Sequence, residues 1–160
     1  MDVVDYGLYK VKDEYFERFK SSYFTDNKSE NRPYYLSFKD KDNIIWLIPL
    51  SSQTANYQLK ISQDIENRGE CLFYYIDKIY GTDRVFLIGN MFPVTKEYIL
   101  GEYTYSKIHY VVQDKKTIKE VSKRAKKFLT LVTYGKLKPY VDILSIKKEL
   151  LNNKKSLVTV

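Results

Sequence analysis

Two adjacent hydroxyl side chains follow an apolar segment that contains a proline. Ser51 and Ser52 come directly after Trp46–Leu50, a run typical of a strand that enters a core. Residues 54–67 then show helical spacing, so the two serines lie where a strand meets a helix. The simplest interpretation is that one serine caps the helix by accepting a backbone N–H. The same geometry, exposed N–H groups beside two hydroxyl donors, also forms a pocket that attracts phosphate.

A phosphodiester site of this kind needs little more than a nearby cation and a group that moves a proton. If the phosphodiester belongs to RNA, the 2′-hydroxyl of the substrate can attack the adjacent phosphorus, and the protein supplies neither nucleophile nor metal. His109 is the only histidine and Cys71 the only cysteine. This composition disfavours a transition-metal site and excludes an internal disulfide. We therefore expect no metal and no cofactor.

Two cations are candidates for the phosphate pocket. Arg32 enters the strand that is expected to pair with residues 44–50, and Lys60 lies about two turns into the helix that follows the serines. For each of them a solvated surface charge is the commoner role. Tyr15 lies on an amphipathic segment, and the pattern alone assigns it only to packing.

Periodicity and turn residues predict the elements that must position these side chains. Helices are expected at about 13–23, 54–67, 114–133 and 142–151, and strands at 6–11, 34–38, 44–48, 71–76, 85–88 and 108–112. Five or six short strands interrupted by helices predict an α+β domain with a strongly bent, mostly antiparallel sheet and three or four helices. We expect one domain over residues 1–151 and a loose tail over residues 152–160.

Charge is distributed unevenly along the chain. Residues 1–106 hold 13 Lys and Arg against 16 Asp and Glu, whereas residues 107–160 hold 14 against 4. In the helix expected at 114–133, apolar residues occupy one face, and the exposed row comprises Lys116, Lys119, Lys123, Arg124 and Lys127. A basic row of this length fits RNA phosphates in a sequence-tolerant, salt-sensitive way, although many basic helices are only solvated faces.

Composition limits the class of protein. With 44% hydrophobic and 29% charged residues, the chain is typical of an ordered globular protein. It has no apolar run of about 18 residues, and Met1–Gly7 lacks the features of a signal peptide, so we expect a cytoplasmic protein without membrane contact.

Several segments, in this order, resemble the ToxN/AbiQ toxins of bacterial type III toxin-antitoxin systems. The resemblance extends from about Tyr9 to about Leu150. It rests on Leu-Tyr-Lys-Val and Glu-Tyr-Phe near the N-terminus, Ile-Pro-Leu-Ser-Ser, the segment Val-Phe-Leu-Ile-Gly-Asn-Met-Phe-Pro-Val-Thr-Lys-Glu-Tyr-Ile, and the late Arg-Ala-Lys-Lys-Phe-Leu. The distance between Pro-Leu-Ser-Ser and Asn-Met-Phe-Pro-Val makes the combination fairly specific.

The resemblance implies a bent sheet similar to the barrel of the MazF and Kid ribonuclease toxins, with added helices. It implies a metal-independent endoribonuclease that leaves a 2′,3′-cyclic phosphate on cellular or phage RNA and acts in phage defence by abortive infection. It also implies a partner: a repeated, pseudoknotted antitoxin RNA that the toxin cuts from its precursor and that holds it inactive in a protein–RNA hetero-oligomer.

Carried over by position, the active-site tyrosine of the family falls on Tyr15, its hydroxyl pair on Ser51 and Ser52, and a basic residue before the strand on Arg32. Some members have a lysine near the position of Thr54. This chain has none there, so Arg32 or Lys60 would serve instead. Two alternatives from other classes remain: a non-catalytic RNA-binding module, and an adaptor whose basic helix binds an acidic protein.

Overall fold

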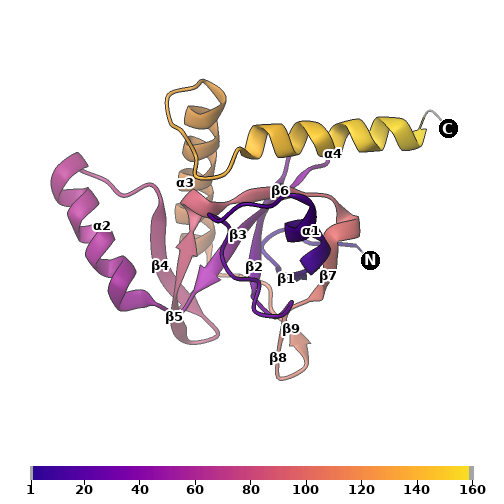
Figure 1. Ribbon diagram of the computed structural model, residues 1–160. Helices are drawn as coiled ribbons and strands as arrows, with labels where there is room; N and C mark the ends of the chain where they lie inside the picture. Colours follow the sequence, from indigo (N-terminus) through magenta and orange to yellow (C-terminus); the bar gives the residue numbers. More distant parts are fainter. Residues whose placement is uncertain (1, 159–160) are drawn as a thin grey trace.

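The computed structural model describes residues 2–158, with side chains to Asn153, and has an α+β fold (Figure 1). The strands are β1 (Leu8–Val11), β2 (Tyr34–Lys39), β3 (Ile45–Ser51), β4 (Tyr74–Ile79), β5 (Thr82–Leu87), β6 (Phe92–Val94), β7 (Ile99–Glu102), β8 (Thr104–Tyr105) and β9 (Ile108–His109). The α-helices of the described chain are α1 (Asp13–Arg18), α2 (Thr54–Arg68), α3 (Lys115–Thr133) and α4 (Ile143–Val158). Short 3₁₀ turns, η1 (Ile88–Asn90) and η2 (Lys96–Tyr98), flank β6.

The main sheet has seven strands in the order β4-β5-β3-β2-β1-β7, with β6 also paired to β3. All strand pairs within the described chain are antiparallel. The predicted α+β class and mostly antiparallel sheet are therefore confirmed. The expected MazF/Kid-like barrel is wrong for this chain. β4 and β7 are the two edge strands of the sheet, and in the described residues they do not pair with each other to close it. After β7 the chain instead folds into the separate β8–β9 hairpin.

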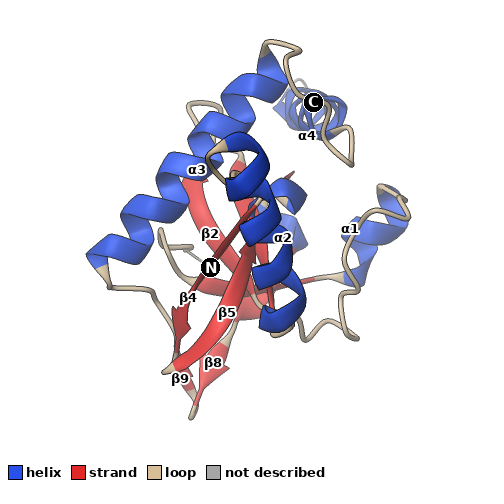
Figure 2. Ribbon diagram, turned by 90° about the vertical axis from the view of Figure 1, so that its left-hand side faces the viewer, coloured by secondary structure: helices blue, strands red, loops and turns tan. Residues whose placement is uncertain are grey.

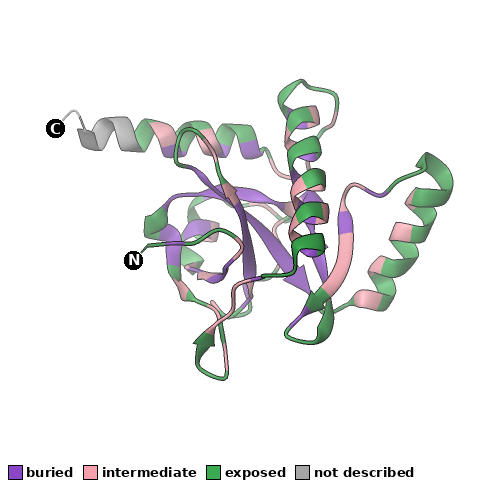
Figure 3. Ribbon diagram, turned by 180° about the vertical axis from the view of Figure 1, so that it is seen from behind, coloured by how far each residue is buried: buried purple, intermediate pink, exposed green. Residues whose placement is uncertain are grey.

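Helices cover the sheet on both faces. Tyr75, whose ring lies under the Arg124 guanidinium of α3, packs against Phe86 on the α3 side, and α3 stands in front of the sheet when the molecule is seen from behind (Figure 3). Tyr74 points the other way and meets Tyr57 of α2 at 4.8 Å. α2 runs beside β4 and β5 (Figure 2), and α1 lies on the same side of the sheet as α2.

The face of the sheet that carries α1 holds most of the aromatic core. Phe16 of α1 stacks on Tyr34 at 6.3 Å and meets Phe92 at 5.7 Å. On the other face, α3 buries Val121, Ala125 and Phe128. α2 differs: all its residues are described and none is buried. It rests on the sheet only through half-buried side chains, so its outer surface stays free.

The positions of the longer predicted elements are confirmed. Asp114 caps α3 by accepting the N–H groups of Lys116 and Thr117 at 2.9 and 3.0 Å, and α2 ends at Gly69 with φ of +81°. The first helix is shorter than predicted, because it ends at Arg18 and the Ser21 hydroxyl then forms a local turn with the Tyr23 N–H.

β4 begins three residues later than the strand expected at 71–76, and β5 begins three residues earlier than the strand expected at 85–88. The other differences lie in short and C-terminal elements. The strand expected at 108–112 is reduced to the two residues of β9, and β6, β7 and β8 were not predicted. α4 continues to Val158, so helix replaces the loose tail expected over 152–158, while residues 159 and 160 lie outside the described residues. No glycine or proline interrupts this segment. None of the described helices combines the length and the apolar character needed to cross a bilayer.

Asp40 ties α4 to the β2–β3 hairpin and generates a pH-dependent prediction. Its carboxylate accepts from Lys147 Nζ at 2.9 Å and from the Trp46 indole at 3.0 Å. Burial acts to raise the pKa of Asp40, but these hydrogen bonds outweigh it and lower the pKa below its usual value. The stabilisation is therefore present above the unfolded-state pKa of about 4 and is lost as pH falls through the lower folded-state pKa.

We expect Asp40→Asn to reduce the free energy of unfolding by about 1–2 kcal/mol at pH 7 and to flatten its dependence on pH below about pH 5. Urea unfolding at a series of pH values measures both. Asp83→Asn is the matched control, because its exposed pair with Lys78 at 3.2 Å contributes about 0.5 kcal/mol or less. Equal losses in the two variants would contradict the assignment.

Candidate anion-binding site

Arg32 and Ser51 lie opposite each other where β2 begins and β3 ends. Tyr34 pairs with Pro49, and the Leu50 N–H donates to the Pro33 carbonyl at 3.2 Å. Continued by two residues, this antiparallel register places Arg32 across from Ser51, on the same face of the sheet. That face is the one that carries α1 and α2. The sequence prediction that Arg32 enters beside the serine strand is correct in placement.

A left-handed turn sets the position of Arg32. Lys28, Ser29 and Glu30 have φ values of 51°, 55° and 66°, a conformation that costs about 1–2 kcal/mol per non-glycine residue. The Asn27 carbonyl accepts the N–H groups of Asn31 and Arg32 at 3.1 and 3.2 Å. These bonds offset the strain and direct Arg32 into the protein.

The Arg32 side chain is buried without a counter-charge. The residue is 8% exposed, and its Nε atom has no hydrogen-bond partner in the described chain. No carboxylate of the described residues forms a salt bridge with it. The nearby Glu30 instead accepts the Asp13 N–H at 2.9 Å. The two terminal nitrogens are not among the fully buried atoms, so an anion that binds them would balance the charge of Arg32.

The two serines supply donors next to this charge. Ser51 is 6% exposed, and its Oγ accepts the Gln53 N–H at 3.2 Å, so the hydroxyl proton remains available to an anion. Ser52 is exposed. Neither serine caps α2, contrary to the simplest prediction: the N-cap is Gln53, without a side-chain cap. With no acidic residue in its first turn, α2 leaves N–H groups and a positive helix end beside Ser51.

Tyr15 does not join this site. It is fully buried, and its hydroxyl donates to the Pro93 carbonyl at 2.8 Å. Pro93 pairs with Trp46, five residues before Ser51, which corresponds to about 15 Å along the strand. Burial raises the pKa of Tyr15 well above its usual value. The structure therefore places Tyr15 in the aromatic core and not at the Arg32–Ser51 corner, and the proton-relay role implied by the resemblance stays a prediction.

Lys60 and His109 are also placed by the structure. Lys60 is exposed on α2, with Nζ 4.9 Å from the Tyr57 ring centroid and 5.8 Å from that of Tyr74. It therefore lies further along the face that carries Arg32. Both ring nitrogens of His109 are occupied, Nε2 by the Leu8 carbonyl at 2.9 Å and Nδ1 by Glu102 at 3.2 Å, so this ring is not a free base.

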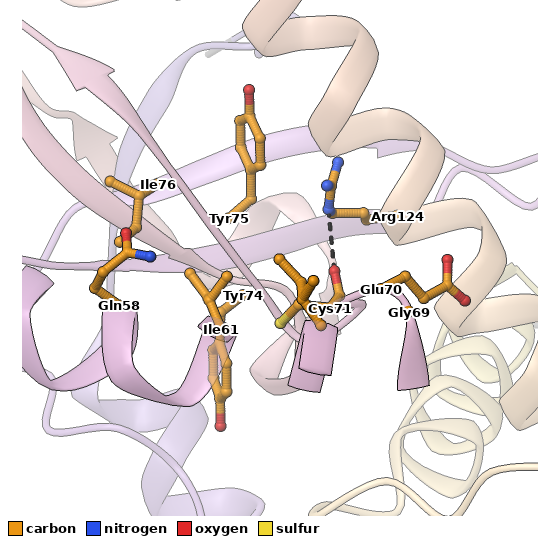
Figure 4. A pocket seen from close by; sticks show the side chains of 10 residues that line it. Gln58, Ile61, Gly69, Glu70, Cys71, Tyr74, Tyr75, Ile76 and Arg124 are labelled. Atoms are coloured by element: carbon orange, nitrogen blue, oxygen red, sulfur yellow. Dashed lines mark hydrogen bonds between the residues drawn. The ribbon is translucent and has the colours of Figure 1, made fainter. Parts of the chain in front are cut away.

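The basic row of α3 lies on the opposite side of the sheet. Arg124 Nε donates to the Cys71 carbonyl at 3.2 Å, beside a cavity of about 380 Å³ between α2 and α3 (Figure 4). Lys123 and Arg124 pair with Glu120, and Lys127 pairs with Glu70. Of the five predicted RNA contacts, only Lys116 and Lys119 make no ion pair within the described chain. The structure does not bring this row to Arg32.

Two residues that shape the site were missed from sequence. The Tyr34 hydroxyl donates to Asn27 Oδ1 at 2.9 Å, and Asn27 Nδ2 donates to the Val11 carbonyl at 2.9 Å. Burial raises the pKa of Tyr34 above its usual range, whereas Arg32 acts to lower it. Asn27 in a polar loop carried one usable signal, because asparagine commonly organises turns through its side chain. Its burial was not evident from the pattern.

Comparisons with known proteins place the fold. A scan of protein-family models and a search of curated proteins gave no match. Among solved structures, the chain is similar to AbiQ, described as a lactococcal anti-phage endoribonuclease belonging to the type-III toxin-antitoxin system. The TM-score is 0.67 at 16% sequence identity, over 92% of this chain and 97% of AbiQ. The chain therefore has the AbiQ fold.

The unpaired charge predicts a response to inorganic phosphate. At phosphate concentrations about tenfold above the dissociation constant, we expect the free energy of unfolding to rise by about 1.4 kcal/mol at constant ionic strength. In Arg32→Met this increase disappears, and stability without phosphate stays equal or rises, because a buried unpaired charge is removed. Thermal and urea unfolding measure both effects.

Arg84→Met is the matched control, since Arg84 lies on β5 and its guanidinium donates to a local carbonyl, that of Asp83. This variant should keep the full response to phosphate. A phosphate response that survives in Arg32→Met would remove Arg32 from the site.

Proposed function

We propose that the protein is a metal-independent endoribonuclease toxin of the type III toxin-antitoxin kind, which cuts RNA at the Arg32–Ser51 site. The observation that carries the proposal is the largely buried residue Arg32, which has no carboxylate partner in the described chain and which the register of β2 and β3, continued by two residues, places across from Ser51. A phosphodiester supplies the missing negative charge. The AbiQ fold supports the same function, because AbiQ is described as an endoribonuclease of such a system.

In the proposed reaction the substrate is its own nucleophile. The 2′-oxygen attacks the adjacent phosphorus and loses its proton, the bond from phosphorus to the 5′-oxygen breaks, and that oxygen gains a proton. The products are a 2′,3′-cyclic phosphate and a 5′-hydroxyl end. Water exchanges both protons in this scheme, because Tyr15 and His109 are engaged by backbone carbonyls.

The protein then contributes binding, orientation and charge. Arg32 offsets the charge that develops on the phosphoryl oxygens, while the Ser51 hydroxyl and the N–H groups at the start of α2 donate to them. Ser52, which is exposed, contacts the RNA strand from the solvent side. Holding the phosphate in a shallow corner also fixes the angle between the attacking and leaving oxygens, which is a large part of the barrier for such a displacement.

The basic row of α3 has a separate role in this proposal. Because α3 covers the face opposite the cleavage site, its lysines would bind RNA that is not being cut. A repeated, pseudoknotted antitoxin RNA that wraps the protein would meet both faces, hold it inactive and be cut from its precursor at the Arg32–Ser51 site. Free toxin would act in the cytoplasm on cellular or phage RNA.

Cleavage in a chelator tests the function directly. We expect purified protein to cut adenosine-rich RNA in EDTA with cyclic-phosphate ends, and to leave the 2′-O-methyl version intact. Arg32→Met should reduce the rate by about 10²- to 10³-fold, and Ser51→Ala by about 10-fold or more, as for lost donors to a transition-state oxyanion. Mass spectrometry of the products and gel kinetics measure these outcomes.

Two other outcomes identify the alternatives. Intact RNA that is retained in a gel shift would indicate a non-catalytic RNA-binding module. Absence of both cleavage and salt-dependent RNA binding would indicate an adaptor for an acidic protein. Either result would contradict the proposed endoribonuclease function.

A conservative change at Tyr15 separates packing from chemistry. Tyr15→Phe keeps the aromatic contacts but removes the hydrogen bond to Pro93, so we expect stability to fall by about 1–2 kcal/mol and the cleavage rate to stay within twofold. Urea unfolding and gel kinetics on one preparation provide both numbers. A loss of more than 100-fold in folded Tyr15→Phe would restore a chemical role for the hydroxyl.

A further inference from the structure

A second cleft lies between α2, β4 and the segment that leads into α4. It has a volume of about 430 Å³, the size of a small-ligand site, and its walls include Lys60, Asp64, Arg68, Tyr74, Lys138 and Tyr140. The cleft lies outside the Arg32–Ser51 corner. It combines positive charge with exposed aromatic rings, the two features that proteins use to bind single-stranded nucleic acid.

Tyr140, which lines the cleft, belongs to an exposed aromatic stack. Tyr140 stacks on Tyr23 with ring centroids 5.9 Å apart and an interplanar angle of 20°, and it meets Phe73 edge-on at 5.8 Å. Tyr23 is 60% exposed and Tyr140 45% exposed. Two segments distant in sequence are thus joined by a ring pair whose remaining surface is open. An unpaired base stacked on such a surface contributes about 1–3 kcal/mol.

The cations of the cleft retain their charge for a ligand. Lys60, Arg68 and Lys138 face a single lining carboxylate, that of Asp64. None of the three cations forms a salt bridge within the described chain. The α3 row differs, because most of its members are paired with Glu120 or Glu70.

The cleft lies on the same face of the sheet as the proposed cleavage site. Tyr74 pairs with Leu87, and Ser51 pairs with Val85, so all four side chains share one face of the sheet. Two strand spacings and two residues separate Tyr74 from Ser51, which is about 12 Å. A strand of RNA whose phosphate lies at Ser51 would therefore place a neighbouring nucleotide at the cleft.

We propose that this cleft binds an unpaired nucleotide of the RNA substrate that flanks the scissile phosphate, with its base against the Tyr23–Tyr140 stack and its phosphate between Lys60 and Lys138. The inference rests on the proposed function in one respect, namely that the bound RNA is the substrate of the protein. Its occupant is single-stranded RNA, because a base in a duplex has no free face to stack on tyrosine.

Binding of an uncleavable RNA tests the cleft independently of catalysis. The probe is a 5′-fluorescein-labelled, adenosine-rich 12-nucleotide RNA with 2′-fluoro substitution, and the readout is fluorescence anisotropy. We expect Tyr140→Leu to weaken binding about 5- to 100-fold, the equivalent of one lost base stack. Tyr140→Phe retains the ring and should bind within threefold of the unsubstituted protein. Lys138→Gln should lower the slope of log affinity against log salt by about 0.7.

Tyr134→Leu is the matched control, because Tyr134 is 74% exposed at the end of α3 and outside the residues that line the cleft. Equal affinities of Tyr140→Leu and Tyr134→Leu would overturn the inference, whether or not the protein cleaves RNA. Failure of the unsubstituted protein to bind the probe would also overturn it. If binding depends on Tyr140 but the protein does not cleave RNA, the result would support RNA binding at the cleft and contradict the proposed endoribonuclease function.

Discussion

Arg32 is largely buried and, by the register of β2 and β3, lies across from Ser51, and no carboxylate of the described chain forms a salt bridge with it. Removing a charged side chain from water costs free energy, which other contacts of the fold must offset. The Asn27 side chain and carbonyl organise the left-handed turn of residues 28–30, and the same side chain accepts the Tyr34 hydroxyl. Glu30, the obvious neutralising group, is directed to the Asp13 N–H. The loop thus favours an external anion as the partner of Arg32.

The corner formed by Arg32 and Ser51 arises from a change of partner along β3. β3 pairs with β6 over Ile45–Leu47 and with β5 over Leu50–Ser51, with η1 between these two strands in the chain. Pro49, which has no N–H to give, falls in the gap between the two ladders. A proline in an internal strand is therefore accommodated without a lost bond to either neighbour. Beyond it the chain leaves the sheet at Ser51 and starts α2 with its first turn uncapped.

Local patterns were sufficient for the long elements and for part of the site. α2, α3 and the β2–β3 hairpin follow from helical spacing, glycine stops and turn residues, and the hairpin register alone brings Arg32 to Ser51. Long-range contacts decided the rest. β6 and β7 are short strands that form by pairing with β3 and β1. A segment of three or four residues is too short to show a periodic pattern in the sequence. The amphipathic pattern assigned Tyr15 to packing and the resemblance assigned it to the active site, and its contacts with Phe92 and Pro93 place it in the core.

Net charge by segment pointed to α3 as the RNA-binding element, but the location of the carboxylates changes that conclusion. Glu120 and Glu70 pair with Lys123, Arg124 and Lys127, so three members of the row are engaged, although the two carboxylates offset only two of the positive charges on α3. The N-terminal part of the chain is acidic in sum, yet it carries Arg32 and Lys60, neither of which forms a salt bridge in the described chain. Because the interaction of two charges falls with distance and screening, the field at a phosphate depends on the nearest unpaired groups and little on the total. The surface around Ser51 therefore holds unpaired cations although the surrounding sequence is acidic, and it is there that the AbiQ-like fold brings a strand end, a helix start and Arg32 together.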